Sequence, residues 1–351
     1  LAATGDLLPH RRVKSTAAAH GWAAVFGEAT PILTAADVAF ANLEGPIAPD
    51  HHRGVHGEVF DAPADLAPAL AAAGLDVVSL ANNHLFDQGP GGLVETRSRV
   101  RAAGVATAGA GATCAEAAEP AIVEVHGVKI AFLAATDLTN LDLNAGADAP
   151  CLFVAGPVCE ADCGPDRDAV QFSHDLPRLL DAVKAARARA DFVVLSFHWQ
   201  IEWITEPLPE YPPLAAALTD AGVDVLLGHH PHVLQPVVER TTADGRRVVI
   251  AYSLGNFVSN MGEKVEPTDP AKGRVRDAIV LQVPLVVYPD GRREVGAPVV
   301  VPLWTENALA PDGTDRITVR TLSSLAQEAP ALAAARAAEI ARIVGESVER
   351  P

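Results

Sequence analysis

The chain has 351 residues, of which 49% are hydrophobic and 20% are charged, and its formal net charge is −17. This composition is typical of a globular protein and excludes a disordered chain. The acidic balance and the lack of a long Lys/Arg run exclude a general nucleic-acid binder, and no apolar stretch approaches the roughly 20 residues of a membrane helix. Because residue 1 is Leu, we expect a processed or trimmed chain. A removed signal peptide or lipid anchor would make it extracytoplasmic or membrane-anchored, and a cytoplasmic location is the alternative.

Short apolar runs that end in polar residues recur in the first hundred residues. Strands are predicted at residues 1–4, 36–40 and 75–80, and helices at 15–26, 61–73 and 93–103. Ligands of open α/β sheets bind at the carboxyl ends of strands. The polar residues that follow these three strands are Asp6, His10, Asn42, Glu44, Asn82, Asn83, His84 and Asp87. Taken singly, Asp6 and Asp87 are equally typical of turn residues or helix caps.

The middle of the chain interrupts this pattern. Residues 121–125 and 128–133 predict a hairpin, and the Asp-, Gly- and Pro-rich stretch 136–172 predicts a long insertion near the site. This stretch contains Cys151, Cys159 and Cys163, whereas Cys114 precedes it. One or two disulfides are expected if the protein is exported. A zinc site and free thiols are the alternatives.

Two further strand ends carry histidines. Residues 191–197 predict a strand that His198 and Trp199 follow, and residues 223–228 predict a strand that His229, His230 and His232 follow. Helices are predicted at 175–190 and 212–221, hairpins at 236–252 and within 274–301, and helix from residue 323. A turn at 253–257 contains Asn256.

Five strand ends therefore carry Asp, Glu, Asn and His on one expected edge. Buried polar groups cost stability unless they pair or bind an ion. A mixed nitrogen and oxygen donor set without Cys suits Mn, Fe, Zn or Co and argues against a structural zinc. We therefore expect a divalent transition metal, and solvated loop histidines are the plainer alternative.

The order of these blocks resembles the CapA family, which is linked to poly-γ-glutamate capsule synthesis, within the calcineurin-like metallophosphoesterases. The blocks that carry the resemblance span roughly residues 1–300: Gly5-Asp6, Asn42-Leu43-Glu44, Ala81-Asn82-Asn83-His84 with Asp87-Gln88-Gly89, His198-Trp199, Gly228-His229-His230-Pro231-His232-Val233 and Tyr252-Ser253-Leu254-Gly255-Asn256-Phe257. The resemblance implies an α/β (α+β) fold, a four-layer α/β/β/α sandwich of two mixed sheets flanked by helices. It places this domain at residues 1–305, followed by a C-terminal helical extension at 306–351.

The resemblance also implies roles for single residues. Asp6 and His232 would bind one ion, and Asn83, His198 and His230 a second. Glu44, or as an alternative Asn42, would bridge the two ions. His10 and His229 would be further ligands or would lie behind the ligands, and His84 would be the general acid, oriented by Asp87. Arg11, Asn82, Trp199 and Asn256 would bind substrate. Because Leu8 replaces the His of the phosphoesterase Asp-x-His motif, a single ion is the alternative.

The expected function is a metal-dependent hydrolase or transferase that acts on a phosphoester or on an amide of an anionic polymer such as poly-γ-glutamate. Partners would be that polymer or a phosphorylated small molecule, and a membrane-associated polymer synthesis complex, but no nucleic acid. Arg11, Arg12 and the loop His51–His56 would offset the chain's negative charge. The alternative is a non-catalytic, metal-stabilised binding or assembly component of capsule or envelope polymer synthesis.

Overall fold

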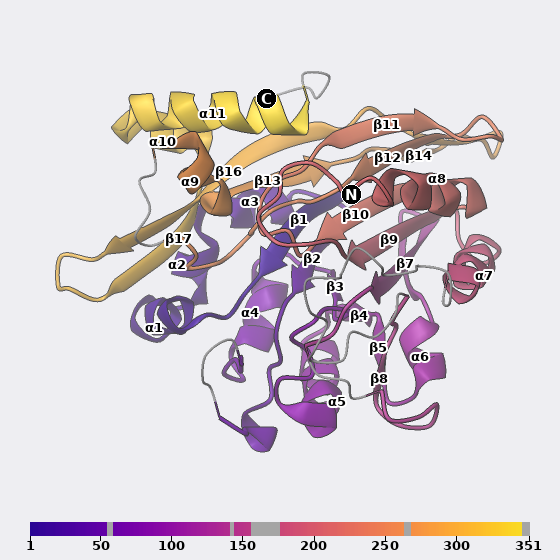
Figure 1. Ribbon diagram of the computed structural model, residues 1–351, viewed down its shortest axis with the longest axis horizontal. Helices are drawn as coiled ribbons and strands as arrows, with labels where there is room; N and C mark the ends of the chain where they lie inside the picture. The colour runs from indigo at the N-terminus through magenta and orange to yellow at the C-terminus, as the bar shows by residue number, and fades with distance from the viewer. Residues whose placement is uncertain (55–58, 141–143, 156–175, 263–267, 346–351) are drawn as a thin grey trace.

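Two stacked β-sheets form the centre of the protein in the computed structural model (Figure 1). The structure describes residues 1–54, 59–140, 144–155, 176–262 and 268–345. The seven-stranded sheet has the order β17-β16-β13-β1-β2-β3-β4, and the six-stranded sheet has the order β11-β12-β10-β9-β7-β6. In each sheet, a parallel group of strands is extended by antiparallel strands at one or both edges.

The parallel strands of the seven-stranded sheet are β1 (Ala2–Leu7), β2 (Ala39–Leu43), β3 (Val77–Ser79) and β4 (Ala106–Ala108). Its antiparallel strands are β13 (Asp277–Gln282), β16 (Val299–Leu309) and β17 (Asp315–Thr321). The parallel strands of the six-stranded sheet are β7 (Val128–Thr136), β9 (Phe192–His198), β10 (Val225–His229) and β12 (Arg247–Ala251), and β6 (Ala121–Val125) and β11 (Val237–Thr241) flank them. Two small ladders pair β5 (Ala110–Gly111) with β8 (Cys151–Leu152), and β14 (Leu285–Val287) with β15 (Arg293–Val295).

Helices cover the outer face of each sheet. The apolar faces of α1 (Arg11–His20), α2 (Trp22–Phe26), α3 (Thr30–Thr34), α4 (Leu66–Ala72) and α5 (Gly89–Ala102) pack on the seven-stranded sheet. Those of α6 (Cys114–Ala118), α7 (Leu176–Arg187) and α8 (Tyr211–Ala221) pack on the six-stranded sheet. A third apolar cluster fills the space between the sheets, where Phe40 stacks on Phe132. The predicted four-layer α/β/β/α sandwich is therefore confirmed.

The C-terminal region differs from the helical extension predicted from residue 306. Residues 306–309 complete β16 and residues 315–321 form β17, so this segment belongs to the seven-stranded sheet. Only then do α10 (Leu322–Glu328) and α11 (Pro330–Val344) follow. Apolar residues of both helices, including Leu325 and Ile340, pack into the cluster between the sheets, and α11 lies across the strand layers at the top of Figure 1. The short α9 (Pro270–Gly273) precedes β13.

A disulfide links Cys114 at the start of α6 to Cys151 in β8. This bond confirms the expectation of a disulfide for one pair of cysteines. Cys159, Cys163 and residues 156–172 of the predicted insertion lie outside the described residues. Among the described helices, none is long and apolar enough to cross a membrane.

Candidate metal centre

The polar residues predicted at strand ends meet where the carboxyl ends of the parallel strands of both sheets come together. His229 and His198 are paired across β10 and β9, and Asp6 is paired with Asn42 across β1 and β2. The carboxyl-terminal ends of β1 and β10 also approach each other closely, since His229 Nδ1 lies 3.1 Å from Asp6 Oδ1. One edge of the sandwich therefore gathers side chains from segments more than 200 residues apart in sequence.

Two glycines permit a close approach of the 252–255 turn to β1 and β10. A Cβ atom on Gly5 would lie 1.9 Å from the carbonyl oxygen of Gly255, and one on Gly228 would lie 1.9 Å from that of Tyr252. Any larger residue would displace the 252–255 turn. Because these glycines immediately precede Asp6 and His229, the turn lies directly against the strand ends that carry these two residues.

Asp6 is fully buried and contacts several other residues of the site. Its Oδ1 accepts a hydrogen bond from Asn42 Nδ2 at 2.9 Å, and its Oδ2 accepts one from the backbone N–H of His230 at 3.2 Å. His232 Nδ1 lies 3.3 Å from Oδ2. Burial by itself raises the pKa of Asp6, but the hydrogen bonds with His229 and His232 outweigh it and hold this pKa well below its usual value. Asp6 is therefore an ionised carboxylate at neutral pH.

Glu44 is also fully buried, but its surroundings differ. Its Oε1 lies 3.5 Å from His232 Nε2 and 3.7 Å from His198 Nε2. Neither carboxylate oxygen has a hydrogen-bond partner among the described residues. Burial raises the pKa of Glu44 well above its usual value, against the opposing charge of His232. A buried carboxylate without donors is costly, and a cation between Glu44 and the imidazoles would satisfy it.

Three groups of side chains place their ligand atoms within 4.8 Å of one another: Asp6 with Glu44 and His232, Glu44 with His198 and His230, and Glu202 with His230 and His232. The first two groups share Glu44, as a bridging carboxylate would require. Asn83 Oδ1 adds a neutral oxygen 2.9 Å from His198 Nε2. The described residues thus hold a donor set that fits one or two divalent ions.

The backbone turns two of these imidazoles into position. His230 and His232 have φ values of 93° and 55°, in the left-handed region that side chains rarely adopt. Such strained conformations concentrate at functional sites. His232 Nδ1 donates to Asn256 Oδ1 at 3.0 Å, because the amide nitrogen of Asn256 donates to the carbonyls of His232 and Val275. The Nε2 atom of His232 is thereby turned toward Glu44.

Burial and neighbouring charges shift the pKa values of His198 and His232 in opposite directions. Burial, and then the neighbouring His230, lower the pKa of His198 well below its usual value, so its ring is neutral, as a ligand must be. Burial also opposes protonation of His232, but the carboxylates of Glu44 and Asp6 raise its pKa to about 9. An ion bound here would have to displace that proton.

His84 lies beside this centre. Its Nδ1 lies 2.9 Å from Asp87 Oδ2, which also accepts a hydrogen bond from the Phe60 backbone at 2.6 Å. The Phe60 ring packs on the imidazole with centroids 4.3 Å apart, and Asn140 Nδ2 lies 3.4 Å from Nε2. Asp87 thus orients His84, as a general acid requires.

Three of the four predicted substrate-binding residues are buried. Trp199 is fully buried and donates from its indole to Tyr252 O at 2.9 Å. Asn82 donates to Asn42 Oδ1 and Leu43 O, and Asn256 holds His232. In this structure, the polar groups of these three side chains are engaged by hydrogen bonds within the protein. Arg11 is exposed at the first residue of α1.

His10 and His229 lie beside the ligand groups without joining them. Ser259 and Asn260 lie 3.3 Å from His10 Nδ1, the ring packs on Phe60, and burial lowers the pKa of His10 to about 3. His229 contacts Asp6 from the side of the sheet core, where it packs near Phe40. Neither histidine belongs to the ligand groups found among the described residues.

Two residues of the site were not predicted from the sequence. Glu202 lies four residues after His198 on the same loop, and its Oε1 is 4.0 Å from His232 Nε2. Asn140 lies beside the His84 ring, and its Oδ1 accepts a hydrogen bond from Asn83 Nδ2 at 3.1 Å. A carboxylate soon after a strand-end histidine was the available signal for Glu202. Asn140 had none, because it lies within the predicted insertion.

Comparison with known proteins assigns this chain to a family. The family model of the bacterial capsule synthesis protein PGA_cap matches residues 1–261. The chain belongs to the PGA_cap family. The matched region contains every candidate metal ligand named above. The strands β13, β16 and β17 and the C-terminal helices lie beyond the matched residues.

The curated relatives of this PGA_cap protein include two from Bacillus. The capsule biosynthesis protein CapA of Bacillus anthracis is 30% identical over 262 residues, which are 74% of this chain and 59% of that protein. The PGA biosynthesis protein CapA of Bacillus subtilis (strain 168) is 29% identical over 294 residues, covering 83% of this chain and 69% of that protein. The chain thus spans less than two thirds of the first relative. A solved structure of a hypothetical protein from Thermus thermophilus has a TM-score of 0.47 at 18% identity, covering 86% of this chain and 98% of that one.

Proposed function

We propose that this PGA_cap protein is a metal-dependent hydrolase that cleaves an amide of an anionic glutamyl polymer. The observation that carries the proposal is Glu44, a buried carboxylate that faces two imidazole Nε2 atoms and that no described donor satisfies. The substrate class follows from the names of the two relatives, which refer to capsule and PGA biosynthesis. A transferase would use the same centre with an acceptor other than water.

The roles of the residues follow from their contacts. Asp6, Glu44, Asn83, His198, His230 and His232 would hold one or two ions of Mn, Fe, Zn or Co, with Glu202 at the more open side. A bound ion of this class polarises a carbonyl or phosphoryl oxygen and lowers the pKa of water. Asp87 holds the ring of His84, which would protonate the leaving nitrogen. Asn256 and Asn42 would fix the orientation of His232 and Asp6.

The location belongs to the proposal as well. The Cys114–Cys151 disulfide supports an oxidising, extracytoplasmic compartment, where such bonds persist. A polymer synthesis complex at the membrane would supply the anionic chain on which the protein acts.

A His84→Ala variant tests the catalytic role. We expect it to lose hydrolysis of a glutamyl polymer and of an aryl phosphate while it binds metal as the unaltered protein does. The matched control is His20→Ala, an exposed histidine on α1. If the unaltered protein hydrolyses neither substrate with Mn, Fe, Zn or Co, the enzyme proposal fails. A His84→Ala protein that still supports polymer production would instead indicate a metal-stabilised assembly component.

A further inference from the structure

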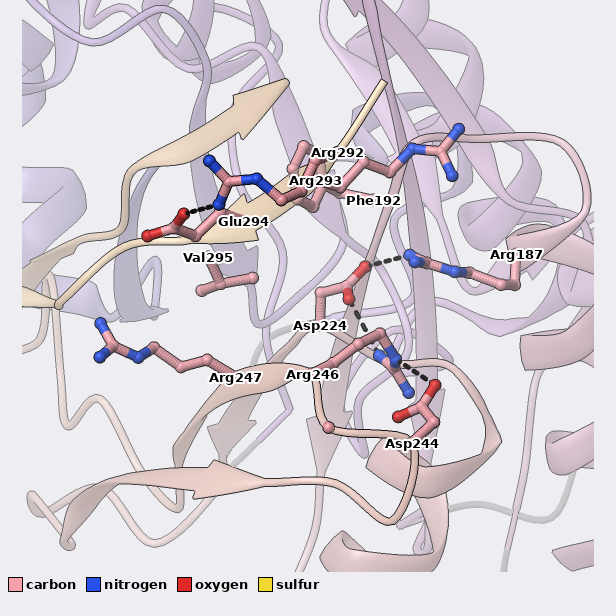
Figure 2. Close-up of a pocket in the computed structure, with 11 residues that line it drawn as sticks. Arg187, Phe192, Asp224, Asp244, Arg246, Arg247, Arg292, Arg293, Glu294 and Val295 are labelled. Carbon is pink, nitrogen blue, oxygen red and sulfur yellow. Dashed lines mark hydrogen bonds and ion pairs between the residues drawn. The ribbon is translucent and has the colours of Figure 1, made fainter. Parts of the chain in front are cut away.

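A second polar cavity lies at the opposite end of the six-stranded sheet from the metal centre (Figure 2). Its volume is about 360 Å³, within the range of ligand pockets. Phe192, the first residue of β9, lines the cavity, whereas His198, the last residue of that strand, faces the metal centre. At about 3.3 Å per strand residue, the two sites are roughly 20 Å apart. The cavity is therefore distinct from the site described above.

Five arginines from three separate segments line this cavity. Arg187 comes from the end of α7, Arg246 and Arg247 from the start of β12, and Arg292 and Arg293 from the turn that leads into β15. Three carboxylates line it with them: Asp224, Asp244 and Glu294. Among these lining residues, five arginines face three carboxylates, although the whole chain carries a net charge of −17. Asp191 and Glu239, just outside the lining, each pair with one of the arginines.

Asp224 fixes two of the arginines at the inner side of the cavity. This buried carboxylate lies 2.5 Å from Arg187 Nη1 and 3.0 Å from Arg246 Nη1, and it also accepts from the backbone N–H of Val193. Figure 2 shows both guanidinium groups converging on it. Their orientation is therefore set before any ligand arrives, which reduces the entropy that binding would cost.

The other three arginines form the solvent-exposed rim. The side chains of Arg247, Arg292 and Arg293 are 51%, 56% and 45% exposed. Each contacts one carboxylate: Glu239 at 3.4 Å, Glu294 at 2.7 Å and Asp191 at 2.7 Å, respectively. A guanidinium carries five N–H donors, so one carboxylate leaves several of them available for a second anion.

We propose that this arginine pocket binds a carboxylate-rich chain, which in the proposed function is the glutamyl polymer. Planar guanidinium groups match carboxylates in bidentate geometry. In Figure 2, the Arg292 guanidinium lies beside Glu294, and the neighbouring Arg293 side chain extends in the opposite direction. Such a spread suits successive carboxylates along an extended chain rather than one compact anion. The pocket would hold the polymer while a distant part of it occupies the metal centre.

Fluorescence anisotropy of a labelled oligoglutamate tests this proposal in the metal-free protein, with EDTA present. We expect the Arg292→Ala/Arg293→Ala double variant to bind roughly tenfold more weakly or worse. The matched control is Arg101→Ala/Arg189→Ala, which removes two exposed arginines outside the pocket. The control should bind as the unaltered protein does, and an uncharged oligoglutamine should not compete.

Three results would overturn the proposal that the arginine pocket binds the polymer. The first is no binding by the unaltered protein, and the second is an equal loss of affinity in both double variants. The third is displacement of the labelled oligoglutamate by inorganic phosphate at lower concentrations than by unlabelled oligoglutamate. This binding assay needs neither metal nor turnover. Its failure is therefore distinguishable from failure of the proposed function, which would appear as absent hydrolysis with the pocket intact. The proposal depends on the proposed function only for the identity of the polymer.

Discussion

Glu44 is the side chain on which we expect metal binding at the candidate centre to depend most. Its carboxylate is fully buried, faces His198 and His232, and has no described donor. We predict that Glu44→Gln weakens metal binding at least about tenfold, because the amide removes the negative charge shared by two ligand groups. Calorimetric metal titration of the variant and of the unaltered protein measures this effect.

The control for this prediction is Glu95→Gln on α5, where the carboxylate pairs with His51 and Arg99 away from the centre. Its metal affinity should equal that of the unaltered protein. Unchanged metal affinity in Glu44→Gln would remove Glu44 from the ligand set.

His232 makes metal binding depend on pH. Its pKa of about 9 in the folded, metal-free protein exceeds the ordinary value of 6.5, despite burial, because of Glu44 and Asp6. The proton therefore stabilises the metal-free fold fully below about pH 6.5, and this contribution is lost as the pH rises through 9. We predict that the melting temperature of the metal-free protein falls across this window.

Metal affinity should rise over the same window, by up to about tenfold per pH unit, because the ion displaces the His232 proton. Titrations in buffers of different ionisation enthalpy would reveal that proton. Equal affinities at pH 6.5 and pH 9 would contradict this account of His232.

At the residue scale, the sequence predicted which residue types gather but not how deeply they lie. Asp6, Glu44, Asn83, His198, His230 and His232 were all predicted from their places after apolar runs, and the structure brings them together. Trp199 and Asn256 were expected to touch substrate, but burial is set by the whole fold and cannot be read from a local motif. Glu202 was missed because it lies beyond the strand end, on a loop without periodicity.

At the scale of elements, α11 is fastened to the sheet that carries Asp6. Arg336 on α11 is fully buried and forms a two-contact ion pair with Asp277 of β13, the neighbour of β1. We predict that Arg336→Ala lowers the free energy of unfolding by about 3–5 kcal/mol, because it leaves the Asp277 carboxylate buried without its partner. Denaturant unfolding of the metal-free protein measures this loss.

Two further variants test the origin of that loss. Arg342→Ala breaks a half-exposed pair with Glu339 on the same helix and should cost no more than about 1 kcal/mol. Replacing both Arg336 and Asp277 by apolar residues of similar size should cost much less than Arg336→Ala. Equal losses in Arg336→Ala and Arg342→Ala would show that the buried pair is not what fastens α11.

The elements that the sequence predicted best are those with continuous apolar runs. The strands β9 and β10 are buried on both faces, as parallel strands between layers are, and their predicted limits differ from the observed ones by one or two residues. By contrast, β17 carries Asp315, Arg316 and Arg320, and its pairing partner is the equally mixed end of β16. Such strands are specified by long-range pairing, which local pattern does not contain.

At the scale of the whole molecule, the two-sheet sandwich separates two polar sites. The candidate metal centre lies at the carboxyl ends of β9 and β10, and the arginine pocket lies at their amino ends. The order of the motif blocks was enough to predict the layers. The arginine pocket was not predicted, because its residues are spread from position 187 to position 295 without a shared motif.

The most direct test of the central claim is the metal content of the protein, purified natively without chelator and measured by elemental mass spectrometry. Anomalous diffraction at the metal absorption edge would locate the ion. We predict one or two divalent transition-metal ions per chain, bound between Glu44 and the histidines His198, His230 and His232. A chain that carries no such ion, and that binds none when Mn, Fe, Zn or Co is added, would contradict this prediction.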